Sequence, residues 1–238
     1  MADSSYAALA TNIFTAPREA FVALREQPRV LLPVLVLLIG FSTVSFYFLS
    51  HVDMGFFLDN ELRSGSANIT DAQREQAVAA AAKIPPLVYG AIGAVGAIFS
   101  RLLVIFLIAA YYTIVSSATH DGVKLKQWFA LACWCTLPQV LGVVAQIVNM
   151  LVNDPRFMLP DSINPLAFGN LLSIDRAGTP TVQRILLGID VTAVWTVVLL
   201  VLGYQSFTKK PYATSAAIVL APIALIVAIG TLIAMLRQ

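Results

Sequence analysis

Charged residues are scarce in this sequence of 238 amino acids. Aspartate, glutamate, lysine and arginine together make up 12% of the chain, whereas 58% of the residues are hydrophobic. A soluble domain typically has about a quarter of its residues charged, and a chain of this length cannot build a core large enough to hide so much apolar surface from water. The shortage of charge therefore excludes an ordinary soluble domain and indicates an integral membrane protein.

Residues that bind metals or carry out catalysis are also few. The two cysteines, Cys133 and Cys135, are two positions apart, so on a helix they point in different directions and cannot form a disulfide with each other. We interpret both as small packing residues, and His120 with Asp121 as a solvated pair at a turn. Catalytic motifs and basic nucleic-acid-binding stripes are absent. We expect no enzyme activity, no cofactor, no metal and no nucleic-acid partner.

Five apolar runs are long enough to cross a bilayer, which takes about 20 residues. The sequence therefore predicts an all-α fold, a transmembrane bundle of five helices in one domain over residues 1–238, with two longer external loops. Residues 1–29 form a cytoplasmic or interfacial segment, and the first span is a retained helix rather than a cleaved signal peptide. The predicted spans cover residues 30–50, 87–117, 128–152, 185–205 and 212–236.

The distribution of lysine and arginine predicts the orientation. Each side of the membrane receives seven such residues, but on the side of the N-terminus they cluster beside the ends of the spans. We therefore predict a cytoplasmic N-terminus and an external C-terminus.

The segment before the first span predicts a short helix that begins at Pro17. Two arrangements fit it: a helix lying in the headgroup layer, with arginines toward anionic lipid, or a helix packed on the protein's own cytoplasmic face. The candidate contacts with lipid or a partner on this side are Arg18, Phe21, Arg25, Lys209 and Lys210.

The two external loops carry different signals. Thr70 and Gln73 match a capping box, so the first loop is expected to be partly helical. The second loop, residues 153–183, is unusually apolar. It lies on the outer membrane surface or against a partner, with Phe157 and Phe168 as candidate contacts, or else it packs over the protein's own helix ends.

Two charges fall inside predicted spans, Arg101 in the second and Asp190 about five residues inside the fourth. Each is costly in hydrocarbon and needs a physical reason. We expect both in the outer half of the bilayer, where they could form a buried ion pair. The pair serves either as a structural clip or as part of a path for an ion or substrate, and Arg101 could also extend to the headgroups.

Small residues recur along the second span. Glycines at Gly90, Gly93 and Gly96 let helix backbones approach closely in lipid. We expect these three glycines to pack against another helix, in this chain or in a partner.

The order of these features resembles the Yip domain family of five-span membrane proteins, first named as partners of Ypt/Rab GTPases, and its bacterial branch in particular. The likeness extends over nearly the whole chain. The residues that carry it are Asn12 to Phe21, Pro28, His120-Asp121-Gly122, Trp128-Phe129, Leu137-Pro138, Asp190-Val191, Trp195, Leu202-Gly203 and Lys209-Lys210.

The resemblance implies a non-enzymatic accessory protein of a bacterial inner membrane. Its expected partners are the lipid bilayer and another integral membrane protein, such as an ABC exporter with its periplasmic adaptor. Two alternatives stay open: a small carrier or lipid-handling protein that uses Arg101 and Asp190, and a Rab-type trafficking factor.

Overall fold

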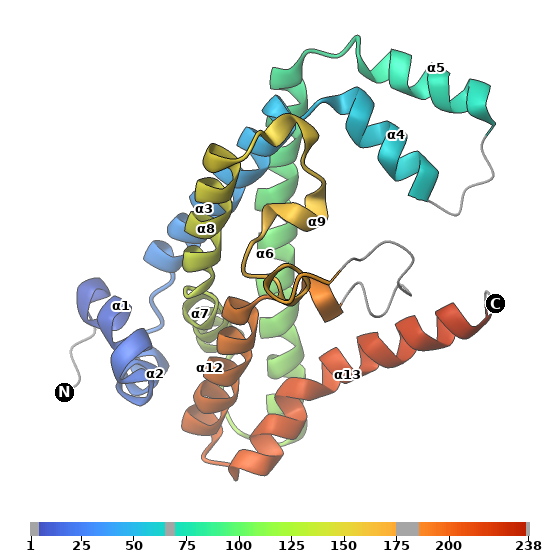
Figure 1. Cartoon of the computed structure of the whole chain (residues 1–238). Coiled ribbons are helices and arrows are strands. Elements are labelled where there is room, and N and C mark those ends of the chain that lie inside the picture. Colours follow the sequence, from blue (N-terminus) through green and yellow to red (C-terminus); the bar gives the residue numbers. More distant parts are fainter. Residues whose placement is uncertain (1–4, 65–69, 175–185, 237–238) are drawn as a thin grey trace. The chain divides into compact units, whose positions relative to one another are not determined.

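The computed structural model describes residues 5–64, 70–174 and 186–236, and nearly all of these residues lie in helices or the turns between them (Figure 1). The predicted all-α fold is confirmed, and five helical segments within the described residues are long and apolar enough to span a membrane. These are α3 (Leu31–His51), α6 (Pro86–Ala118), the pair α7 (Leu125–Cys135) and α8 (Gln139–Val152), α12 (Val191–Thr208) and α13 (Tyr212–Leu236).

The third span is divided into two helices by Pro138. Proline lacks an N–H group, and its ring collides with the carbonyl four residues earlier, so α7 ends at Cys135 and α8 begins at Gln139. The Thr136 hydroxyl lies 3.0 Å from the carbonyl oxygens of both Ala132 and Cys133, and it donates to these groups at the end of α7. A buried threonine thus compensates for part of the interruption.

By its internal contacts the chain divides into two compact units. Unit 1 contains residues 1–37, 101–142 and 166–238, and unit 2 contains residues 38–100 and 143–165. The core of unit 1 is rich in aromatic side chains. Trp128, Tyr204 and Phe207 are fully buried, and the Trp128 ring stacks on Tyr204 with 5.1 Å between centroids. Cys133 and Cys135 are buried and unpaired, as predicted.

Unit 1 begins with two helices, α1 (Tyr6–Thr15) and α2 (Pro17–Glu26), so Pro17 does start a helix. α2 packs against α12 and α7, and its apolar side, including Phe21 and Leu24, is fully buried in the chain. The expectation that Phe21 contacts lipid or a partner is therefore wrong, because the chain's own helices cover it. Of the two arrangements considered for this segment, the structure has α2 packed on the protein's own helices.

Unit 2 holds α4 (Met54–Ser64), α5 (Asp71–Ala81) and α8 from Val143 onward, followed by a 3₁₀ turn, η1 (Pro155–Phe157), and α9 (Pro160–Ile163). The predicted capping box is confirmed: the Gln73 N–H donates to the Thr70 hydroxyl at 3.3 Å, and the Thr70 N–H donates to the Gln73 amide oxygen at 2.9 Å. Met158 and Ile163, from the loop that follows α8, are buried in the core of this unit. This stretch of the loop thus packs on the protein itself.

In unit 2 the glycines of α6 approach α3. A Cβ added at Gly90 would lie 3.0 Å from the Phe46 carbonyl oxygen, and one added at Gly93 would meet the Leu49 side chain. A Cβ at Gly96 would meet open space. The structure therefore brings two of the three predicted packing glycines against α3 and leaves the third away from any neighbour.

The substitution Gly90→Ala should lower the stability of the protein in detergent by about 1–3 kcal/mol, because the added methyl group overpacks a contact with backbone. The matched control is Gly96→Ala, which adds the same methyl group to the same helix without a contact and should leave the melting temperature unchanged or slightly raised. Thermal denaturation of both variants measures the difference. Equal melting temperatures would show that α3 and α6 are not in close contact here.

Candidate functional site

Arg101 lies in α6 and is hydrogen-bonded to a neutral side chain of the third span. Its Nη1 donates to Gln139 Oε1 at 2.8 Å. The Gln139 amide in turn donates from Nε2 to the Thr196 hydroxyl of α12 at 3.2 Å. One glutamine thus joins α6 to α12, and polar groups inside a bilayer need such partners because no water replaces them.

Asp190 is placed differently from the sequence expectation. It does not lie five residues inside the fourth span but is the N-cap of α12, which begins at Val191; the predicted start at Ile185 falls outside the described residues. Its Oδ1 accepts hydrogen bonds from the Ala193 N–H and the Thr192 hydroxyl, both at 2.7 Å. The physical reason for the correction is that a short carboxylate satisfies the free N–H groups of a helix start.

These groups form one continuous set of hydrogen bonds, which we call the polar chain: Arg101, Gln139, Thr196, Thr192 and Asp190. Its central link is the Thr196 hydroxyl, which donates to the Thr192 carbonyl at 2.9 Å. The carboxylate of Asp190 also acts on Arg101 electrostatically. The two predicted charges are therefore connected through neutral residues, and a direct ion pair between them stays a prediction.

Sequence reasoning missed the three neutral members of the polar chain. Their signal was present but weak: Gln139 follows the helix-breaking Pro138, and Thr192 and Thr196 are four residues apart, on one face of α12. Single neutral polar residues are common in spans, so only the fold reveals that these three meet.

Replacing Gln139 by leucine should destabilise the protein by about 1–3 kcal/mol, because the Arg101 guanidinium loses an acceptor in a site that water does not replenish. Gln146→Leu is the matched control on the same helix, since the structure shows no hydrogen bond for the Gln146 side chain among the described residues. Chemical denaturation in detergent micelles compares the two. A Gln146 variant as unstable as the Gln139 variant would argue against a specific role for the polar chain.

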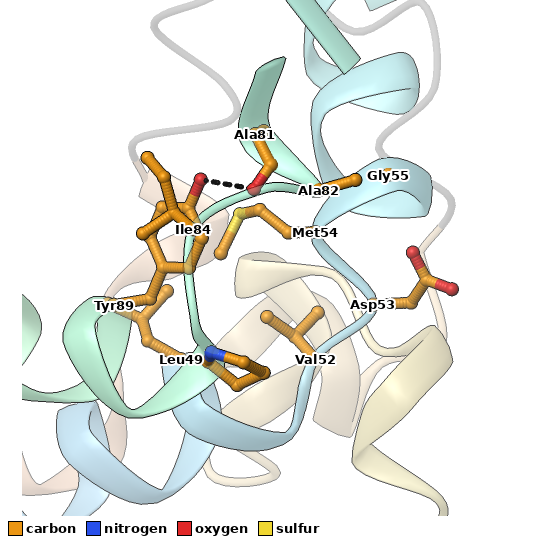
Figure 2. A pocket seen from close by; sticks show the side chains of 10 residues that line it. Leu49, Val52, Asp53, Met54, Gly55, Ala81, Ala82, Ile84 and Tyr89 are labelled. Atoms are coloured by element: carbon orange, nitrogen blue, oxygen red, sulfur yellow. Dashed lines mark hydrogen bonds between the residues drawn. The ribbon is translucent and has the colours of Figure 1, made fainter. Parts of the chain in front are cut away.

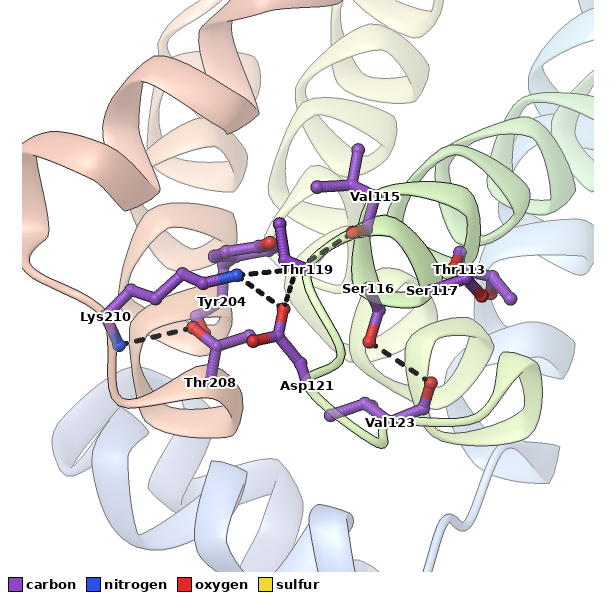
Figure 3. A network of polar contacts seen from close by, with 10 residues as sticks. All are labelled: Thr113, Val115, Ser116, Ser117, Thr119, Asp121, Val123, Tyr204, Thr208 and Lys210. Atoms are coloured by element: carbon purple, nitrogen blue, oxygen red, sulfur yellow. Dashed lines mark hydrogen bonds and ion pairs between the residues drawn. The ribbon is translucent and has the colours of Figure 1, made fainter.

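A second polar cluster, the junction network, joins the α6–α7 turn to the α12–α13 turn (Figure 3). The Lys210 ammonium lies 2.6 Å from Asp121 Oδ2 and 2.7 Å from the Thr119 hydroxyl. It also lies over the ring of Tyr204, 5.9 Å from the centroid. The side chains of Asp121 and Lys210 are 8% and 21% exposed, so the interpretation of His120 and Asp121 as a solvated pair is wrong for Asp121.

The backbone of these turns has left-handed conformations that bring the charged groups together. His120 and Gly122 have φ angles of 56° and 69° in the first turn, and Lys209 has φ 60° at the end of α12. A side chain disfavours this region, and of the three only Gly122 adopts it without strain.

The other predicted contact residues have varied environments. Arg18 donates to the Tyr212 hydroxyl at 2.6 Å and lies over its ring, so it ties α2 to the start of α13. Lys209 is exposed and Arg25 is half-buried. In the loop that follows α8, Phe157 is exposed beside Phe56, and Phe168 is half-buried in α10 (Phe168–Leu171).

Unit 2 contains a small pocket where α3, α4 and the α5–α6 turn meet (Figure 2). Its volume is about 210 Å³, and its walls are largely apolar, with Leu49, Val52 and Met54 among them. The Tyr89 hydroxyl donates to the Ala81 carbonyl at 3.0 Å. The carboxylate at the rim, Asp53, accepts from the Phe56 N–H at 3.0 Å. The polar groups of this pocket are thus occupied by its own walls.

Within the described residues, no group of three or more histidine, cysteine or acidic side chains is placed to hold a metal ion.

Comparison with known families adds a match that extends over all five spans. The model of the Yip1 domain matches residues 11–235. The chain belongs to the Yip1 domain family. No curated protein and no solved structure matches it significantly.

The Yip1 domain of this chain contains both polar clusters. The match begins inside α1 and ends near the end of α13, so it includes the polar chain, the junction network and the packing glycines. The resemblance seen in the sequence is therefore confirmed at the level of the family. With five apolar helical segments among its described residues, this Yip1 domain protein is a multi-pass membrane protein.

Proposed function

We propose that this Yip1 domain protein is a non-enzymatic accessory protein that binds another integral membrane protein. Its place would be the inner membrane, with the N-terminus in the cytoplasm, as a subunit of a larger assembly such as an ABC exporter complex. Support comes from the combination of internally bonded polar groups and an uncovered membrane helix.

The C-terminal half of α13 is one such uncovered surface, and this observation carries the proposal. Its first half packs on the other helices of unit 1: Ser215 and Val219 are buried, and the Tyr111 hydroxyl donates to the Ile218 carbonyl at 2.9 Å. From Leu220 to Leu232 none of the described residues is buried. In the membrane this half must be covered by lipid or by another helix. Its small residues, Ala221, Ala224 and Ala228, suit a helix because they permit close backbone approach.

The arrangement of the polar chain is the second support. A carrier needs polar groups that a substrate can engage, whereas Gln139, Thr192 and Thr196 bond to one another and to the two charged ends. Asp190 is committed to capping α12. These bonds favour a structural clip, and so an accessory protein over a carrier.

Photo-crosslinking from α13 tests the proposal. A photoreactive residue at Ile226, in the uncovered half, should crosslink to a second membrane protein in native membranes. The same group at Ile218, in the packed half, should react within the chain. Gentle extraction should then copurify the crosslinked protein. A chain that crosslinks only to lipid and purifies alone would contradict the accessory role.

Replacing Arg101 and Asp190 together by apolar residues distinguishes an accessory protein from a carrier. An accessory protein should still bind its partner wherever the double variant folds, whereas a carrier should lose transport.

A further inference from the structure

Basic side chains from three separate segments gather at one end of unit 1. We propose that this basic face binds the headgroups of anionic phospholipids. The basic face consists of Arg18, Arg25, Arg29, Lys124, Lys126 and Lys209.

Hydrogen bonds at both ends of α2 bring these segments together. Near the end of α2, the Gln127 amide donates to the Arg25 carbonyl at 2.7 Å, which places the helix beside the start of α7 and its two lysines. Near the beginning of α2, Arg18 bonds to Tyr212 at the start of α13, three residues after Lys209. α2 therefore lies across the ends of two spans, and the cations lie at the level where those spans leave the membrane.

The charge of this end is strongly positive. Its nearby carboxylates are Glu19, Glu26 and Asp121, and Asp121 is taken up by Lys210 in the junction network. The basic face thus has six cations and two exposed glutamates beside them. Its net charge is +4 with His120 neutral. Anionic lipids attract such a face over a distance of about 10 Å.

Several of these cations have no competing partner. Among the described residues, the structure shows no ion pair or hydrogen bond for the side chains of Arg25, Lys124, Lys126 or Lys209, and the three lysines are exposed. Neighbouring side chains with apolar surface are also exposed, notably Val22, Leu125 and Tyr212. A mixture of cations and apolar groups beside membrane ends is typical of surfaces that lie in the headgroup layer.

Lipid retention on the isolated protein tests this inference independently of any protein partner. The protein is reconstituted in bilayer discs of equal phosphatidylglycerol and phosphatidylcholine, gently extracted, and analysed for bound lipid by native mass spectrometry. Wild type should retain phosphatidylglycerol in preference. The variant R25Q/K124Q/K126Q should lose this preference by roughly fivefold or more, since each cation near the surface contributes about that factor.

The matched control, R25K/K124R/K126R, keeps every charge and should keep the preference. Melting temperatures of both variants, equal to that of wild type, show that the fold is intact. Equal retention of the two lipids by wild type would overturn the inference, and so would an unchanged preference in the neutral variant. Binding of an acidic soluble protein that displaces phosphatidylglycerol from the face would also overturn it.

Discussion

Lys210→Met should be among the most destabilising single substitutions in this protein, with a loss of about 3 kcal/mol. The reason is that the Asp121 carboxylate, only 8% exposed, would lose the cation that balances it. The neighbouring substitution Lys209→Met removes the same charge from an exposed side chain and should have little effect. The measurement is thermal unfolding followed with a thiol-reactive dye, because Cys133 and Cys135 are buried until the chain opens.

A double variant strengthens this test. Asp121→Asn with Lys210→Met removes both charges and should recover part of the lost stability, since no buried charge is left unpaired. If the two lysine variants melt at the same temperature, the junction network does not hold the two turns together.

Trp128→Ala should have an effect of similar size, about 3–5 kcal/mol, because it removes a fully buried ring. The ring of Trp128 contacts Tyr112, Tyr204 and Phe207 with centroids 5.1–5.4 Å apart, so its loss opens a cavity between α6, α7 and α12. Trp128→Phe should restore part of the stability.

The comparison residue is Trp195, which is half-buried and has an edge contact with Phe14 at 5.4 Å. Trp195→Ala should cost clearly less than Trp128→Ala in the same thermal assay. A larger loss at Trp195 would contradict the placement of the unit 1 core.

The spans were predictable because they depend on local composition. A run of about 20 apolar residues signals a membrane helix whatever surrounds it, and the capping box of Thr70 and Gln73 lies within four residues of chain. The wrong predictions concern side chains that are compatible with more than one environment. Asp190 could lie within a helix or cap one. The sequence does not show that the carboxylate has a lower free energy as a helix cap than as a charge in hydrocarbon.

The candidate site was less predictable because its contacts are distant in sequence. Arg101 and Gln139 are 38 positions apart, and Gln139 and Thr196 are 57 apart. Asp121 and Lys210 were each visible as charges near a membrane end, but their pairing across 89 positions depends on how two turns meet. The segment around Phe21 likewise has the same spacing of apolar residues whether its helix faces lipid or protein.

The late start of α12 has a consequence for the membrane itself. With 18 residues, this helix is about 27 Å long, whereas the 33 residues of α6 extend about 50 Å. The hydrocarbon layer of a bilayer is about 30 Å thick, so α12 matches a thin layer while α6 must tilt or project beyond it. Spans of such unequal length should locally deform the surrounding lipid and favour residence in the thinner regions of a membrane.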